Sequence, residues 1–304
     1  MAEKSVPTQK RLVLLSGRSH PELAESVADE LGIALSPTLA YDFANGEIFI
    51  RFRESVRGTD AFVLQSHTTP INTWIMEQLI MIDALKRASA KRITVIVPFY
   101  GYARQDKKHR GREPISARLM ADLFKAAGAD RAEHVASRVA TDQITVVSPD
   151  AGRVRVAERW TDVLGAPLAI IHKRRDPDVP NQVRVFEVVG DVRDRVCVVV
   201  DDMIDTGGTI VKAAETLFEN GAKDVIVAAT HGILSDPARD RLQQSQISEV
   251  VVTDTLPIPP ERQFDKLTVL SIAPILATAI NEVFTDGSVT SMFEAATADE
   301  ASSH

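Results

Sequence analysis

The chain has 304 residues, of which 44% are hydrophobic and 25% charged, and its formal net charge is −7. This length suits two α/β domains and the composition is that of a soluble globular protein, while the negative charge argues against a general nucleic-acid binder. The single cysteine excludes an internal disulfide, no apolar run approaches the roughly 20 residues of a membrane-spanning helix, and residues 1–9 lack a signal-peptide core, so we expect a cytoplasmic protein without a membrane partner.

Short apolar runs alternate with helical patterns, which is typical of parallel sheets with crossover helices. In the first half, apolar runs predict strands at 11–16, 61–66 and 92–99. Helical spacing predicts a helix at 72–90, and a second helix is expected at 115–127. Residues 41–47 indicate a turn between a loop and a strand at 48–53, and a plain hairpin turn is the default interpretation of that signal.

The second half repeats the alternation. Helices are predicted at 153–164, 209–220 and 274–284, and strands at 144–148, 168–172, 183–189, 196–202, 224–231, 249–253 and 267–272. We therefore expect an α/β fold with two similar layered domains, 1–145 and 146–294, in which the last helix is able to pack on the first domain. Residues 295–304 are small and polar, and we expect a disordered tail there.

The most informative segment is 196–210. Five apolar residues lead into Asp201 and Asp202, as in a buried central strand that ends in two carboxylates. Gly207 and Gly208 allow a tight turn and the close approach of a ligand, where the N–H groups of the following helix favour an anion. Carboxylates beside an anion-binding loop suit a phosphorylated pentose. An ordinary strand–turn–helix with an acidic edge is the alternative interpretation.

Other strand ends carry polar groups as well. Residues 98–114 combine aromatic rings, which can flank a base, with cations that can neutralise phosphates, although a solvated basic loop is also typical of such a charge run. Asp150 either holds a cation or caps the next helix. Lys173, Arg174 and Arg175 repel one another unless a polyphosphate binds near them. No pair of histidines has metal-ligand spacing, so each is more typical of a structural or solvated residue.

With these segments together, the chain resembles the ribose-phosphate pyrophosphokinases, especially the actinobacterial members, from about Arg11 to Glu294. The segment 201–209 alone fits any phosphoribosyltransferase relative. The segments Phe43-Ala44-Asn45-Gly46-Glu47 and Arg104-Gln105-Asp106-Lys107-Lys108 are similar to the nucleotide-binding signatures of this family and, with the chain length, disfavour a phosphoribosyltransferase that acts on a base. The resemblance implies two phosphoribosyltransferase-like domains, each a mainly parallel sheet flanked by helices, in a homo-oligomer that is commonly a hexamer.

The resemblance implies an enzyme that transfers pyrophosphate from ATP to the C1 hydroxyl of ribose 5-phosphate and releases AMP, with Mg²⁺ as cofactor and with ADP and phosphate as candidate effectors. Lys173 and Arg175 would be catalytic residues on a flexible loop, and Asp150 would bind the metal. The N-terminal domain would bind ATP through Phe43, Asn45, Glu47, Arg104, Gln105 and Asp106. The C-terminal domain would bind ribose 5-phosphate through Asp201, Asp202, Asp205, Thr206, Gly207, Gly208 and Thr209.

The resemblance is interrupted at about 132–145. Thr141-Asp142-Gln143-Ile144 looks like the remnant of a family motif, and Ala140 stands where the family has a magnesium-binding histidine. The residues before this remnant are more typical of a short helix than of a strand, and a long family connection is absent. His134 would replace the lost ligand only if this segment folds differently. The alternative function is therefore a catalytically impaired homologue that binds nucleotide or sugar phosphate and regulates an active synthetase by co-assembly.

Overall fold

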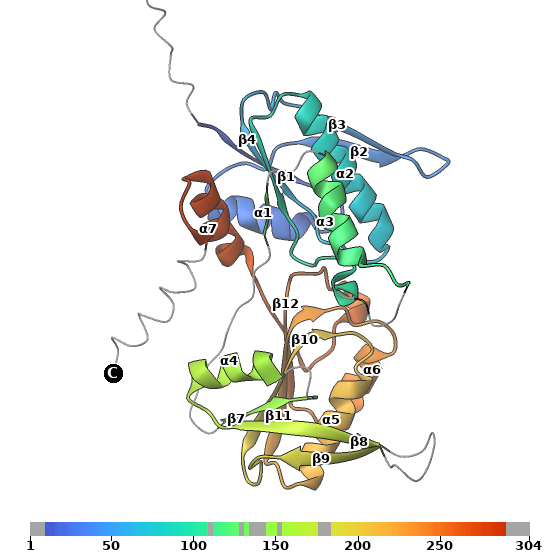
Figure 1. The fold of residues 1–304 in the computed structure, drawn as a ribbon, viewed down its shortest axis with the longest axis vertical. Coiled ribbons are helices and arrows are strands. Elements are labelled where there is room, and N and C mark those ends of the chain that lie inside the picture. Colours follow the sequence, from blue (N-terminus) through green and yellow to red (C-terminus); the bar gives the residue numbers. More distant parts are fainter. Residues whose placement is uncertain are drawn as a thin grey trace, which may run out of the picture. The chain divides into compact units, whose positions relative to one another are not determined.

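The computed structural model describes residues 10–106, 108, 112–127, 131–133, 144–150, 154–175 and 184–289. The chain divides into two compact units (Figure 1): unit 1 is Met1–Val135 with Ala273–His304, and unit 2 is Ala136–Ile272. Residues 134–143 and 290–304 lie outside the described residues. The predicted domain limits and the predicted disorder of the tail therefore stay predictions.

Unit 1 is built on a parallel sheet with the strand order β1-β4-β5-β6, and it carries a separate antiparallel pair, β2-β3. The strands are β1 (Leu12–Ser16), β2 (Thr38–Asp42), β3 (Ile48–Phe52), β4 (Asp60–Leu64), β5 (Arg92–Ile96) and β6 (Arg131–Glu133). The helices are α1 (Pro21–Glu30), α2 (Ile71–Arg87), the 3₁₀ turn η1 (Ala103–Gln105), α3 (Ser116–Ala127) and α7 (Ala273–Phe284).

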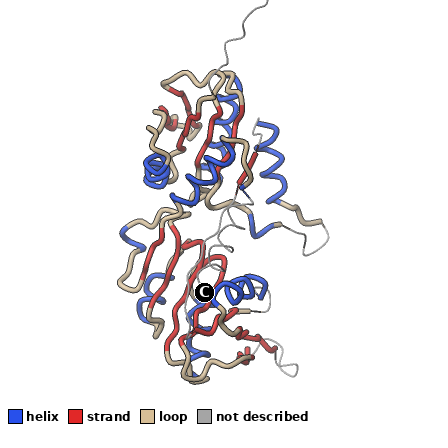
Figure 2. Tube along the Cα trace, turned by 90° about the vertical axis from the view of Figure 1, so that its left-hand side faces the viewer, coloured by secondary structure: helices blue, strands red, loops and turns tan. Residues whose placement is uncertain are grey.

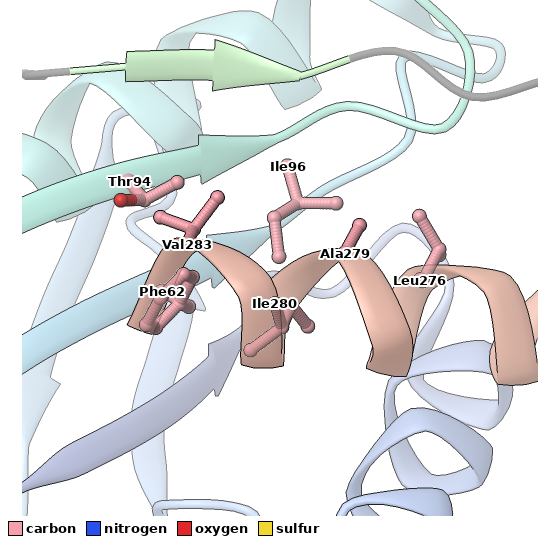
Figure 3. A pocket seen from close by; sticks show the side chains of 7 residues that line it. All are labelled: Phe62, Thr94, Ile96, Leu276, Ala279, Ile280 and Val283. Atoms are coloured by element: carbon pink, nitrogen blue, oxygen red, sulfur yellow. The ribbon is translucent and has the colours of Figure 1, made fainter. Parts of the chain in front are cut away.

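Both faces of this sheet are covered, which explains why its central strands β4 and β5 are mainly apolar after their charged first residues, Asp60 and Arg92. Val63 and Val95 belong to the core cluster that contains the buried residues of α2 and α3. Their strand neighbours Phe62 and Ile96 point to the other face, since successive side chains alternate. There they line a small apolar pocket with Thr94 and with Leu276, Ala279, Ile280 and Val283 of α7 (Figure 3). Helix α7 also packs against α1.

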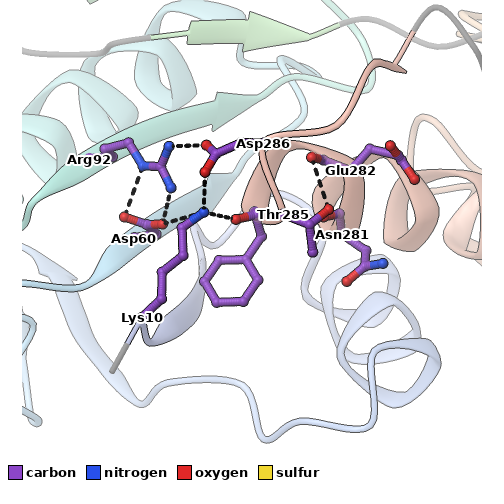
Figure 4. A network of polar contacts seen from close by, with 8 residues as sticks. Lys10, Asp60, Arg92, Asn281, Glu282, Thr285 and Asp286 are labelled. Carbon is purple, nitrogen blue, oxygen red and sulfur yellow. Dashed lines mark hydrogen bonds and ion pairs between the residues drawn. The ribbon is translucent and has the colours of Figure 1, made fainter. Parts of the chain in front are cut away.

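The end of α7 is fixed to the sheet by charged groups (Figure 4). The side chain of Asp60, at the start of β4, is 3% exposed and accepts two hydrogen bonds from Arg92 of β5: Nε to Oδ1 at 3.0 Å and Nη2 to Oδ2 at 2.5 Å. Arg92 also bonds Asp286, just past α7, at 2.5 Å, and Lys10 bonds Asp286 at 2.7 Å. The ammonium of Lys10 also donates to the carbonyl of Phe284. The C-terminal helix is therefore held to unit 1 by both apolar and ionic contacts.

Unit 2 is a seven-stranded sheet in the order β13-β12-β11-β10-β7-β8-β9, parallel except for the pair β8-β9. The strands are β7 (Ile144–Ser148), β8 (Leu168–Arg175), β9 (Arg184–Val189), β10 (Val196–Ile204), β11 (Asp224–Gly232), β12 (Glu249–Thr253) and β13 (Leu267–Leu270). The helices are α4 (Val154–Leu164), α5 (Gly208–Glu219), α6 (Ala238–Gln244) and the 3₁₀ turn η2 (Pro260–Arg262). Figure 2 shows the strands of each unit as a sheet with helices on its faces.

The central strand β10 alternates between two cores. Cys197 and Val199 pack in the cluster that contains the buried residues of α5 and α6, whereas Val198 and Val200 pack with Ala157 of α4. Cys197 is fully buried, and burial raises the pKa of its thiol to about 11, as expected for a small apolar core residue. Among the described residues, no helix has both the length and the apolarity needed to cross a membrane.

The predicted fold class, an α/β fold with mainly parallel sheets flanked by helices, is confirmed. Two local expectations are wrong. Residues Thr38–Asp42, expected as a loop, form a strand that pairs with β3, so that the turn before β3 is the hairpin turn of the default interpretation. Residues Arg131–Glu133, in a segment expected to be helical, form a strand that pairs with β5. In both cases the sheet neighbour supplies backbone hydrogen bonds that the local sequence does not reveal. Helices α1 and α6 received no prediction from the sequence.

Candidate functional site

The carboxyl end of β10 places two acidic side chains at the middle of the seven-stranded sheet. Asp201 and Asp202 are partly buried, and Asp201 Oδ1 accepts a hydrogen bond from the backbone N–H of Asp202 at 2.8 Å. Strand β10 continues to Ile204, pairing with β11 up to Gly232. Ligands of open parallel sheets bind outside the carboxyl ends of the strands, so these two carboxylates lie where a ligand is expected.

The loop after β10 turns directly into α5. Gly207 has φ +72°, a conformation that L side chains rarely adopt, and its carbonyl accepts the N–H of Val211 as α5 begins. A Cβ at Gly207 would lie 3.4 Å from Leu242 Cγ, so the turn is also closely packed against α6. The first N–H groups of a helix lack partners inside the helix and attract anions. Asp205 is partly buried, Gly208 is half-buried, and Thr206 and Thr209 are exposed around this helix start.

Arg241, which the sequence reasoning missed, supports this loop. From α6 its guanidinium donates a hydrogen bond to the carbonyl of Thr206 at 3.0 Å, and its Nη1 lies 3.4 Å from where a Cβ on Gly208 would be. Because α6 is only seven residues long and was not expected, no pattern in the sequence placed a cation beside the turn.

Asp150 lies at the same edge of the sheet. Strand β7 pairs with β10 so that Val147 lies opposite Val199; Asp202, on β10, and Asp150, two residues past the end of β7, each come three residues after this pair. Asp150 is partly buried, and its carbonyl accepts a hydrogen bond from the Ser148 hydroxyl at 2.7 Å. Within the described ranges, no three His, Cys, Asp or Glu residues cluster in a way that could hold a metal ion.

The backbone of Lys173 and Arg175 lies on the antiparallel pair β8-β9, in register with Phe186 and Arg184 respectively. Strand β8 pairs with β7 only as far as Ile170, so these two positions lie on the part of β8 that extends beyond β7. The expectation that Lys173 and Arg175 lie on a loop is therefore wrong for their backbone, which belongs to β8 because the pairing with β9 extends the strand beyond residue 172. Residues 176–183 lie outside the described residues. His134 and Ala140 lie outside them as well.

In unit 1, the predicted base-binding residues lie at the tip of the β2-β3 ribbon, which extends beyond the rest of the unit in Figure 1. Phe43 and Glu47 close the turn through a backbone bond of 2.8 Å, and Asn45 Oδ1 accepts the N–H of Glu47 at 3.2 Å. Phe43 is 47% exposed and makes edge contacts with Tyr41 and Phe49. The tip is thus an ordered turn with an exposed aromatic cluster.

The base of this ribbon is tied to the core of unit 1 through Arg18. Its Nη2 donates to Asp42 of β2 at 2.6 Å, and its Nε donates to Glu77 of α2 at 2.6 Å. Glu77 is fully buried, and Gln65 Nε2 donates to it at 3.0 Å. The hydrogen bond from Arg18 holds the pKa of Asp42 below its ordinary value. The ribbon therefore starts from a buried, charge-compensated anchor.

Arg104, Gln105 and Asp106 lie on η1 and directly after it, past the carboxyl end of β5, and all three are exposed. The loop begins at Gly101, whose backbone N–H donates to Nδ1 of His67, and turns at Tyr102, which has φ +65°. The Ser116 hydroxyl donates to Gln105 Oε1 at 2.5 Å. These three residues form one exposed group in unit 1, whereas the acidic edge and the loop 205–209 of unit 2 are mostly partly buried.

Known proteins match both halves of the chain. A model of the N-terminal domain of ribose phosphate pyrophosphokinase matches residues 12–128, and one of the phosphoribosyl synthetase-associated domain matches 170–294. The ribose-phosphate pyrophosphokinase of Streptomyces avermitilis is 64% identical over 314 residues, covering 94% of this chain and 97% of that protein. That of Mycobacterium tuberculosis is 58% identical, with 97% and 99% covered.

A crystal structure of phosphoribosylpyrophosphate synthetase from Mycobacterium smegmatis is 56% identical, covers 91% of this chain and 100% of that chain, and has a TM-score of 0.84. The Streptomyces alignment spans 314 positions but covers only 94% of a chain of 304 residues, so the relative has residues without a counterpart here. The expected departure at 132–145 falls between the two matched regions. The resemblance predicted from the motifs is confirmed, and the chain belongs to the ribose-phosphate pyrophosphokinase family.

Proposed function

We propose that this chain is a magnesium-dependent ribose-phosphate pyrophosphokinase, in which unit 1 binds ATP and unit 2 binds ribose 5-phosphate. In the reaction, the C1 oxygen of ribose 5-phosphate attacks the β-phosphorus of ATP. A new C1–O–Pβ bond forms, the bond from the β-phosphorus to the bridging oxygen of AMP breaks, and the hydroxyl proton passes to solvent. The products are phosphoribosyl pyrophosphate and AMP.

The observation that carries the proposal is the edge formed by β10 and the start of α5. Phosphorylated pentoses present cis hydroxyls and a phosphate dianion at opposite ends. Asp201 and Asp202 offer acceptors for the hydroxyls, and the turn at Gly207 opens a helix N-terminus to the phosphate. The threonine hydroxyls of Thr206 and Thr209 add donors around the same anion. Both halves of the ligand are thus matched by one short segment.

Charge neutralisation is the main requirement of such a transfer, because negative charge moves from the attacking oxygen to the leaving oxygen. We infer that Lys173 and Arg175 supply positive charge to the transferred group and that Asp150 binds the metal. A single carboxylate suits Mg²⁺, which in such sites is held by one or two carboxylates together with substrate phosphates. When bound, Mg²⁺ would screen the phosphate charges and orient the ATP.

The first test of the pentose site is a matched pair of variants. Asp201→Asn together with Asp202→Asn should weaken ribose 5-phosphate binding by about 100-fold or more, because each hydrogen bond to a charged group is worth about 1.5–3 kcal/mol. The control is Asp224→Asn, at the opposite end of the same sheet, where Asp224 pairs with Val196. Calorimetric titration with ribose 5-phosphate measures the affinity of the double variant and of the control. Equal affinity in the wild type and the double variant would refute the pentose assignment.

The impaired homologue remains the alternative that the departure at about 132–145 leaves open. The assay that separates the two is the formation of AMP from ATP and ribose 5-phosphate in the presence of magnesium and phosphate. AMP that depends on ribose 5-phosphate supports the enzyme. Binding of ribose 5-phosphate with no AMP supports the homologue that acts by co-assembly. The proposal extends to a homo-oligomer, a hexamer by resemblance, and to ADP and phosphate as effectors; sedimentation and ADP titration of the same assay test these points.

A further inference from the structure

His67 is a buried histidine whose two ring nitrogens have opposite roles. Its side chain has no exposed surface, and the backbone N–H of Gly101 donates to its Nδ1 at 2.9 Å. Its Nε2 lies 2.9 Å from Oε1 of Gln78, which is itself fully buried. Because Gln78 Nε2 points to the carbonyl of Val63 at 3.5 Å, Oε1 faces His67 and must accept its proton. The ring is therefore neutral, with hydrogen on Nε2 and a bare Nδ1.

The apolar residues packed around the imidazole of His67 favour its neutral form. The ring stacks on Phe124 of α3 with an interplanar angle of 20° and contacts Tyr100, with both centroids 5.8 Å away. Burial lowers the pKa of His67 to about 4. At neutral pH the Nδ1 lone pair therefore remains available as an acceptor, and the N–H of Gly101 has a partner inside the protein.

The bond from Gly101 fixes the first residue of the loop that carries Arg104 to Asp106. A second bond joins the same two chain segments, since the N–H of His67 donates to the carbonyl of Phe99 at 3.0 Å. A Cβ at Gly101 would lie 2.9 Å from Ile71 and 3.2 Å from His67, so the backbone lies directly against the ring. Beyond it, η1 is only three residues long and has few backbone bonds of its own. The exposed side-chain bonds from Ser116 to Gln105 and from Tyr102 to Asn72 also hold η1, but its buried attachment is at the start of the loop, at Gly101.

We propose that His67 is a positioning residue for the nucleotide: it holds Gly101, and through it the loop bearing Arg104 and Gln105, in the conformation that binds ATP. This inference rests on the proposed function in one respect, the identity of ATP as the ligand of that loop. The side chain of His67 acts on the nucleotide through the loop and without touching the substrate. The hydrogen bond accepted by Nδ1, and not the packing of the ring, positions Gly101.

Two variants separate the acceptor from the ring. His67→Asn retains an oxygen bonded to Cγ, close to the position of Nδ1, but loses the ring packed on Phe124. His67→Phe retains the ring but leaves the N–H of Gly101 without an acceptor. The proposal predicts that His67→Phe raises KM for ATP about 10-fold, as expected for a lost buried hydrogen bond, with KM for ribose 5-phosphate unchanged. His67→Asn should keep KM for ATP within about twofold of the wild type although its stability falls.

Amide hydrogen exchange provides a readout that does not require activity. Exchange at residues 101–106 should rise in His67→Phe and stay near the wild-type rate in His67→Asn. The reverse order, or equal changes in both, would show that the ring acts only by packing. If the wild type makes no AMP, the proposed function fails, while the exchange rates still decide the role of His67. If His67→Phe does not fold, ¹⁵N-histidine spectra of the wild type decide: a protonated Nδ1 overturns the proposal and a bare, hydrogen-bonded Nδ1 supports it.

Discussion

Replacing Arg92 tests how the C-terminal helix is held in unit 1. Arg92→Met removes both hydrogen bonds to Asp60, whose side chain is 3% exposed, and leaves Lys10 Nζ at 4.0 Å as its remaining cation among the ion pairs of the described residues. Removing one partner of a buried ion pair costs about 3–5 kcal/mol, and the remaining lysine favours the lower end, about 3 kcal/mol. Asp286→Asn removes a partner that is 65% exposed, so it should be much less destabilising than Arg92→Met.

Urea unfolding measures these differences. The two tryptophans lie in different units, Trp74 in unit 1 and Trp160 in unit 2, so a Trp160→Phe background lets fluorescence report unit 1 alone. The double variant Arg92→Met with Asp60→Asn should be more stable than Arg92→Met by itself, because it no longer buries an unpaired carboxylate. The reasoning is refuted if Arg92→Met and Asp286→Asn are equally destabilising, or if the double variant is the least stable.

Four further outcomes follow from the structure. Burial lowers the pKa of His67 from 6.5 to about 4, so the stability linked to its neutral form is complete above about pH 6.5 and is lost as the pH falls toward 4. The unfolding free energies measured in urea at about pH 7 and 5 should therefore differ by about 2 kcal/mol more in the wild type than in His67→Phe. Gly207→Ala, at φ +72°, should cost about 1 kcal/mol in thermal unfolding and also weaken ribose 5-phosphate binding, whereas unchanged affinity would remove the turn from the site. Lys173→Ala should lower kcat by about 100-fold or more with little change in ATP affinity, since its charge is proposed to act during transfer; equal losses in both would indicate a plain binding role. Ile280→Ala, at a side chain 2% exposed beside the pocket of Figure 3, should lower the unfolding free energy by about 3 kcal/mol, and a loss below about 1 kcal/mol would mean that the site collapses around the cavity.

Sequence alone predicts the elements whose residues are buried on both sides. The run 196–200 predicts the strand that became β10, because a central parallel strand has to be apolar throughout. Strand β2 is not predicted in this way, because its residues are half-buried or exposed and its pairing with β3 depends on the turn at Gly46, which has φ +87°. Helix α1 is not predicted either, because small residues such as Ala24 and Ala28 fill its buried face and give only a weak apolar pattern.

In the candidate site, the sequence predicts the residues that lie close together in one short segment of the chain. Asp201 to Thr209 lie on a strand, a turn and a helix start that are consecutive in the chain, so their proximity is already given by local geometry. The supporting residues are different. Arg241 reaches Thr206, and His67 reaches Gly101, only through tertiary packing across about 34 residues in each case. A single sequence contains no signal for such pairs, and the fold is needed to find them.

The return of α7 to unit 1 has a consequence for how the chain is made. Unit 1 begins near the N-terminus, yet the helix that covers Phe62 and Ile96 follows the whole of unit 2. A ribosome that adds about 5–20 residues per second releases the last piece of unit 1 only after every strand of unit 2 has been synthesised. During that interval the part of the first sheet that α7 covers lacks this helix, so nascent chains that have passed Val135 but do not yet include α7 are the ones we expect chaperones to hold.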